Sequence, residues 1–123
     1  MTLPTQEQMR LSVTRPADST VAFVRIVGDV DLSDTAALDH AARQLLAVPA
    51  SVTYVDLGGA SLVGSTLVAF LLHLADVRSA IRRPLVLCRP TLLGRKVICI
   101  TGLNQVAEIW PDLPSDWPLA APV

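Results

Sequence analysis

Short runs rich in β-branched residues alternate along the chain with longer segments in which apolar residues recur every three or four positions. The first pattern is typical of buried or half-buried strands, and the second is typical of amphipathic helices. Strands are predicted at residues 11–13, 21–27, 52–57, 84–88 and 106–110.

Glycines mark the expected ends of the early strands. Residues 16–20 form a predicted turn that joins the first two strands into a hairpin. Gly28 is expected to end the second strand, and Gly58 and Gly59 are expected to break the third.

Two helices are predicted around this third strand. The first covers residues 35–48, with Ser33 or Asp34 as its N-cap and Pro49 just beyond its end. The second runs over residues 65–80. Its apolar stripe is expected to comprise Leu67, Leu71, Leu74 and Ile81.

A third helix is predicted after Pro90, with Gly102 as its C-cap glycine. Its buried face is expected to comprise Leu93, Val97 and Ile100. The element order β-β-α-β-α-β-α-β predicts an α/β domain. Most strands of its mixed, four- to five-stranded sheet should be parallel, with helices packed on the sheet.

The composition of the 123 residues fits one domain with one core, since 51% are hydrophobic and 17% are charged. A mean hydropathy of +0.49 leaves little polar material for the surface, so some apolar surface is expected to face a partner. We expect a flexible segment at 1–10, the domain at 11–110 and a proline-rich tail at 111–123.

The net charge of the chain and the length of its apolar runs indicate which partners and which cellular location to expect. A net charge of −1 gives no basic footprint for nucleic acid. No signal peptide precedes Met9, and the apolar run at 67–74 is too short to span a membrane, so a cytoplasmic protein without membrane insertion is expected. Cys88 and Cys99 are expected to be buried, unreactive thiols, with a regulatory disulfide as the open alternative.

The chain carries little that indicates an enzyme, a cofactor or a metal. Lys96 is the only lysine and lies far from the glycine pair, which argues against a phosphate loop. His40 and His73 both fall in predicted helices, and there is no G-x-S-x-G nucleophile motif. We therefore expect a non-enzymatic protein without a cofactor.

Polar residues cluster at two strand-to-helix junctions. A hard cation could bind to Asp29, Asp31 and Asp34. Helix capping is the favoured interpretation, so no metal site is predicted. Ser65 and Thr66 start the second long helix, where a hydroxyl either caps the helix or accepts a phosphate that the free N–H groups stabilise. Capping is favoured on local physics alone.

Four blocks in this order resemble the STAS domain of bacterial anti-sigma-factor antagonists, and the resemblance covers residues 21–110. Each block is weak alone, but their order and spacing fit the family. The blocks are Gly28-Asp29-Val30-Asp31, Val55-Asp56-Leu57-Gly58, Leu62-Val63-Gly64-Ser65-Thr66-Leu67 and Thr101-Gly102-Leu103.

The resemblance implies a protein that binds an anti-sigma factor of the GHKL serine-kinase type. It implies that this kinase phosphorylates Ser65, with Thr66 as the second choice, and that phosphorylation breaks the complex. The residues that it implies for partner contact are Asp29, Asp31, Gly64, Ser65, Thr66 and Leu67.

Gly64 and Leu67 stand where the family motif has Asp and Gly. This departure favours an alternative, a STAS module that binds without being phosphorylated. Examples of that use are an accessory subunit of a lipid-transport ATPase and a stressosome-type scaffold. A homodimer is a further expectation.

Overall fold

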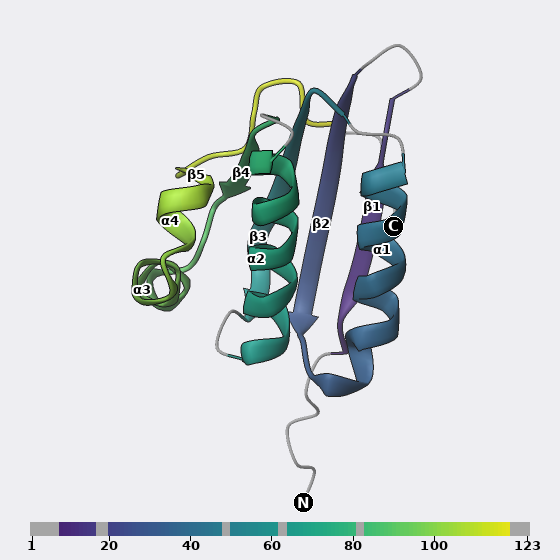
Figure 1. The fold of residues 1–123 in the computed structure, drawn as a ribbon. Helices are drawn as coiled ribbons and strands as arrows, with labels where there is room; N and C mark the ends of the chain where they lie inside the picture. The colour runs from purple at the N-terminus through teal and green to yellow at the C-terminus, as the bar shows by residue number, and fades with distance from the viewer. Residues whose placement is uncertain (1–7, 17–19, 48–49, 62–63, 81–82, 119–123) are drawn as a thin grey trace, which may run out of the picture.

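Five strands form one mixed sheet in the order β1-β2-β3-β4-β5 (Figure 1). The computed structural model describes residues 8–16, 20–47, 50–61, 64–80 and 83–118. The sheet confirms the predicted α/β class and gives the upper of the two predicted strand counts. Pro49, Leu62, Val63 and Ile81 lie outside the described residues, as do residues 17–19 of the turn and both chain ends.

The first two strands form the predicted hairpin, and every later pairing is parallel. β1 (Arg10–Thr14) runs antiparallel to β2 (Val21–Asp29). β3 (Val52–Ser61), β4 (Leu85–Cys88) and β5 (Glu108–Trp110) then follow in parallel.

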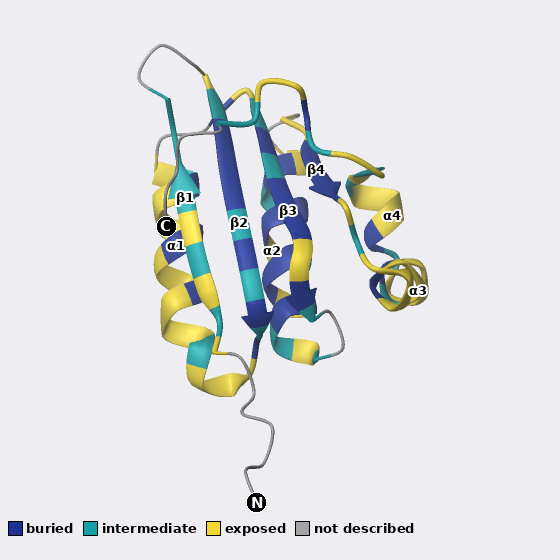
Figure 2. Ribbon diagram, turned by 180° about the vertical axis from the view of Figure 1, so that it is seen from behind, coloured by how far each residue is buried: buried dark blue, intermediate teal, exposed yellow. Residues whose placement is uncertain are grey.

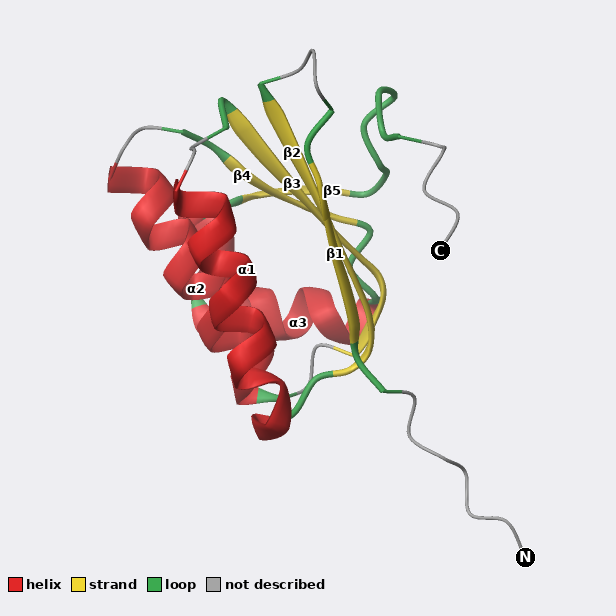
Figure 3. Cartoon of the chain, turned by 90° about the vertical axis from the view of Figure 1, so that its right-hand side faces the viewer, coloured by secondary structure: helices red, strands yellow, loops and turns green. Residues whose placement is uncertain are grey.

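The two long helices lie on one face of this sheet (Figure 3). α1 (Thr35–Ala47) follows a short 3-10 turn, η1 (Leu32–Asp34), and α2 (Ser65–Ala80) matches the predicted bounds. Because both crossovers advance the strand order in the same direction with the usual right hand, both helices fall on the same side. The opposite face is free to carry a different set of side chains.

Two shorter helices lie at the side of the sheet formed by β4 and β5 (Figure 1). α3 (Leu92–Thr101) begins after the N-cap Thr91 and ends at Gly102, whose left-handed φ of 81° confirms the predicted C-cap. α4 (Leu103–Val106) was not predicted, and it contacts α2. Val106 therefore ends a helix instead of starting the last strand.

The core lies between the sheet and α1 and α2, and the central strands are its most buried part (Figure 2). It also encloses Arg78, which is 1% exposed. The guanidinium donates to the carbonyl of Ala50 at 2.8 Å and to that of Pro84 at 3.3 Å. Arg78 thus ties the end of α2 to the chain just before β3 and β4.

Two predicted strand ends are wrong, and the reason is a bulge. Arg25 pairs with Asp56, but Val27 pairs with Gly59, so β3 carries one extra residue here. Because the bulge absorbs the glycines, β3 continues to Ser61. β2 likewise continues through Gly28 to Asp29.

The predicted buried face of α3 is wrong for Leu93 and Ile100, whereas Val97 is partly buried against the core as predicted. Gly94 and Ile98 are its buried residues, whereas Leu93 is 53% exposed and Ile100 is 83% exposed. The helix lies at the edge of the sheet, so only a narrow side of it is covered. Cys99 is consequently exposed, contrary to prediction, while Cys88 is buried as predicted, and both thiols are free.

Candidate functional site

Two strand-to-helix junctions that are distant in sequence meet at one end of the sheet. Asp29 at the end of β2 pairs with Ser61 at the end of β3. Just beyond, a Cβ atom on Gly64 would lie 3.3 Å from the carbonyl oxygen of Val30. The loop before η1 and the start of α2 are therefore in close backbone contact.

A groove of about 350 Å³ opens beside this junction, between α1 and α2. Leu32 lies at the groove and is 81% exposed, which is unusual for a large apolar side chain. The lining residues are Leu32, Thr35, Leu38, Asp39, Ala42, Ser65, Thr66, Ala69, Phe70 and His73.

The two candidate hydroxyls line this groove. Ser65 is exposed and Thr66 is half-buried. Ser65 is the first helical residue of α2, one position past the N-cap. Within the described part of the chain neither hydroxyl has a hydrogen-bond partner, so the favoured capping interpretation is wrong for both.

Asp31 holds the loop on the other side of the junction. Its Oδ1 accepts hydrogen bonds from the backbone N–H, at 2.9 Å, and the hydroxyl of Ser33. These two bonds hold the pKa of Asp31 below its usual 3.8. Asp34 Oδ2 in turn accepts from the Asp31 N–H at 3.0 Å.

Asp31 is thus the N-cap of η1, the turn that leads into α1, and this capping box fixes the loop that exposes Leu32. Across the described ranges, no three His, Cys, Asp or Glu side chains come close enough together to hold a metal ion.

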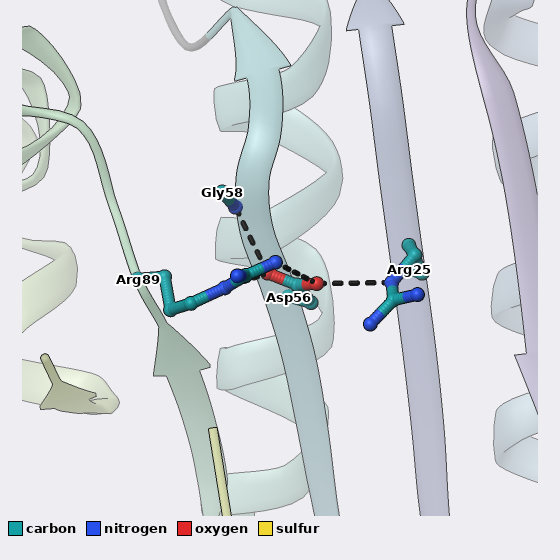
Figure 4. A network of polar contacts seen from close by, with 4 residues as sticks. All are labelled: Arg25, Asp56, Gly58 and Arg89. Atoms are coloured by element: carbon teal, nitrogen blue, oxygen red, sulfur yellow. Dashed lines mark hydrogen bonds and ion pairs between the residues drawn. The ribbon is translucent and has the colours of Figure 1, made fainter. Parts of the chain in front are cut away.

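The other face of the sheet carries a polar cluster around Asp56 (Figure 4). Asp56 is 1% exposed and accepts four hydrogen bonds. Arg89 donates from Nε to Oδ1 at 3.0 Å and from Nη2 to Oδ2 at 2.7 Å. Arg25 Nε donates to Oδ2 at 2.9 Å, and the Gly58 N–H donates to Oδ1 at 2.9 Å.

These donors determine the ionisation of Asp56. Burial alone raises the pKa of the carboxyl, but the hydrogen bonds from Arg89 and Gly58 and the charges of Arg89 and Arg25 outweigh it. The pKa of Asp56 therefore lies below its usual 3.8, and the carboxylate stays ionised. The cluster joins three neighbouring strands or strand ends through one buried charge.

Aromatic side chains cover the same face. Phe23 stacks on Tyr54 with ring centroids 5.8 Å apart, and Tyr54 lies 5.4 Å from Trp110. Trp117, in the segment after β5, meets Phe23 edge-on at 5.1 Å and lies under the Arg25 guanidinium, also at 5.1 Å. The described part of this segment, residues 111–118, therefore packs on the sheet although it contains no helix or strand.

Residues 12–111 match the protein family described as "Mlab, STAS domain". The chain belongs to the STAS domain family. No curated protein matches it. Among the described residues of this STAS domain, no helix is long and apolar enough to cross a bilayer.

Solved structures show the same fold at low identity. An anti-sigma factor antagonist from Mycobacterium paratuberculosis is 20% identical with a TM-score of 0.74, and the match covers 86% of this chain and 88% of that one. SpoIIAA in its unphosphorylated form is 15% identical with a TM-score of 0.69, covering 87% and 90%. The phosphorylated Bacillus SpoIIAA is 18% identical with a TM-score of 0.59, covering 89% and 94%.

The STAS domain brings five of its six predicted contact residues to one end of the molecule. Asp29, Asp31, Gly64, Ser65 and Thr66 lie around the two junctions described above. Leu67 is 0% exposed and packs in the core, so its side chain is not available to a partner.

Sequence reasoning missed Leu32 and the Arg25–Asp56–Arg89 cluster. Asp56 accepts a local bond from the Gly58 N–H, but its arginine partners are 31 and 33 residues away along the chain. The one available signal was Leu32 standing between Asp31 and Ser33, an apolar residue inside a polar capping sequence.

Proposed function

We propose that this STAS domain is a cytoplasmic, non-enzymatic anti-sigma-factor antagonist that binds its partner through the groove between α1 and α2. The observation that carries the proposal is that exposed Ser65 and exposed Leu32 line the same groove. An apolar anchor next to a modifiable hydroxyl suits a protein contact that a phosphate can switch. The names of the solved structures with this fold support the same role.

The proposed partner is an anti-sigma factor of the GHKL serine-kinase type, and the proposed phosphorylation site is Ser65. The Ser65 hydroxyl is accessible and has no hydrogen bond to break within the described residues. A phosphate there would place about two negative charges in a small groove that already contains Asp39. Its desolvation and the repulsion from Asp39 would weaken the complex.

The test uses the GHKL-type anti-sigma factor encoded in the same genome. The purified chain is incubated with this kinase and ATP, and its intact mass is measured. We expect the mass of one phosphate on the wild type and on Thr66→Ala, and none on Ser65→Ala. Phosphate that persists on Ser65→Ala, or an unmodified wild type, would contradict the proposed switch.

Binding is tested separately from phosphorylation, without ATP. Leu32→Asp is expected to weaken kinase binding about tenfold or more, because a charge replaces an apolar anchor. Val106→Asp is the matched control, since Val106 is 42% exposed but lies on α4 away from this groove, and its binding should equal that of the wild type. Equal kinase binding by the wild type and both variants would exclude the groove as the binding site.

A STAS module that is never phosphorylated is the second candidate, and two observations favour it. Gly64 replaces the aspartate of the switch motif, and the matching family is named for Mlab instead of for an antagonist. In this role the chain would be an accessory subunit of a lipid-transport ATPase or a stressosome-type scaffold. A co-purified transport ATPase and a chain that stays unmodified with the kinase would favour it.

A further inference from the structure

α3 presents an unusual outer surface, here called the α3 face: Leu92, Arg95, Lys96, Cys99 and Ile100. All five residues are exposed, Leu92 by 76% and Ile100 by 83%. They recur at the spacing of one helical side. Figure 2 shows how little of this helix is covered. Two large apolar side chains thus lie in water at the end of the molecule beyond β4.

Two shallow, open hollows indent the α3 face. One hollow of about 350 Å³ is lined by the five residues themselves. A second, of about 490 Å³, reaches toward β5 and shares Arg95 and Cys99 with the first. Together they form a two-part groove, and its remaining lining residues are Ile98, Asn104, Ile109 and Pro111.

The charged residues that line the groove are both positive. Arg95 and Lys96 are the only charged residues of α3, both are positive, and Lys96 is the only lysine of a chain with net charge −1. No ion pair to either of them exists in the part of the chain that the structure describes. Unpaired cations beside apolar hollows complement a ligand that carries both acidic and apolar groups.

We propose that the α3 face docks an acidic amphipathic segment of a partner protein, with apolar side chains in the two hollows and carboxylates on Arg95 and Lys96. The hollow between α3 and β5 suits a side-chain anchor, as in helix-in-groove recognition, better than it suits a flat lipid surface. A two-fold contact with a second copy would place like charges against each other. The α3 face shares no residue with the Ser65 groove, so both sites can be occupied at once.

Cys99 provides the probe for the first step of the test. It is exposed, whereas Cys88 is buried with its pKa raised to about 12, so a thiol-reactive photo-crosslinker should attach to Cys99 alone. A second attachment point, Gln105→Cys in a Cys99→Ser background, is exposed but lines neither hollow, so its label does not fill the groove. Host lysate is irradiated with each, and the crosslinked partner segment is identified by mass spectrometry.

The second step uses the unlabelled chain and a synthetic peptide of the captured segment, with calorimetry as the readout. We expect the Arg95→Glu/Lys96→Glu variant to bind the peptide about tenfold or more weakly, and a peptide with lysines for its acidic residues to recover much of that loss. Ile100→Ser should also weaken binding. Arg43→Glu, an exposed charge reversal on α1, should leave it unchanged.

Four results would overturn the proposal. They are peptide binding that the charge reversal does not weaken, a captured segment without acidic residues, crosslinks only between copies of this chain, and charge-dependent binding to phosphatidylglycerol vesicles with no protein captured. The last two would assign the α3 face to self-association and to a membrane surface, respectively. None of these results depends on Ser65. A failure of this proposal can therefore be distinguished from a failure of the proposed function.

Discussion

Arg89 reaches Asp56 from a strained backbone position. Its φ of 54° lies in the left-handed region, which costs free energy for a residue with a side chain. Its N–H donates to the Trp110 carbonyl at 3.0 Å, and its guanidinium makes two hydrogen bonds to the Asp56 carboxylate. The ion pair and the link to β5 stabilise the turn that follows β4.

Asp56→Asn should destabilise the domain by about 2 kcal/mol, measured by urea denaturation. The amide keeps the volume but removes the charge that two arginines share. The cost stays below that of a fully buried pair because the arginine side chains are 33% and 44% exposed. Asp76→Asn, an exposed position on α2, is the control, and an equal loss there would contradict the role of the cluster.

Acid should weaken the domain partly through the same carboxylate. Because the pKa of Asp56 is lower in the folded than in the unfolded chain, its contribution is complete above the unfolded value and is lost as the pH falls below about 4. The free energy of unfolding of Asp56→Asn should therefore fall less over this range than that of the wild type. Asp31, whose pKa is also lowered, contributes to both proteins alike. Parallel pH curves would argue against an ionised Asp56.

Gly58→Ala should act through Arg89. A Cβ atom at Gly58 would lie 2.8 Å from Arg89 Nε and 2.9 Å from its Cζ, so the flexible guanidinium must move away from Asp56. We expect Gly58→Ala to cost about 1 kcal/mol in the wild type and clearly less in an Arg89→Ala background. Equal costs in both backgrounds, from a denaturation cycle, would place the effect in the β3 backbone instead.

The two cysteines should differ in reactivity. Iodoacetamide at about pH 8 is expected to modify Cys99 and to leave Cys88 unmodified, because burial raises the pKa of Cys88 to about 12 and shields its sulfur. Intact-mass measurement should show one added group in the native state and two in urea. Two groups on the folded chain would mean that β4 opens readily.

The elements with regular patterns could be predicted from the sequence. The bounds of α2, the hairpin, the C-cap at Gly102 and the mixed sheet all follow from local spacing and from residues with one strong backbone preference. The strand ends could not be predicted, because a bulge that absorbs Gly58 depends on the register with β2.

Some features of the surface could likewise be predicted from the sequence, and others depend on the fold. The sequence is enough to predict an α/β domain with hydroxyls at Ser65 and Thr66 on one helix start and an acidic turn at Asp29 and Asp31. Only the tertiary structure shows that these two junctions meet, that Leu32 and the α3 face are exposed, and that Asp56 meets two arginines more than 30 residues away. Exposure and ion pairing depend on which elements become neighbours, and only the packed sheet sets that.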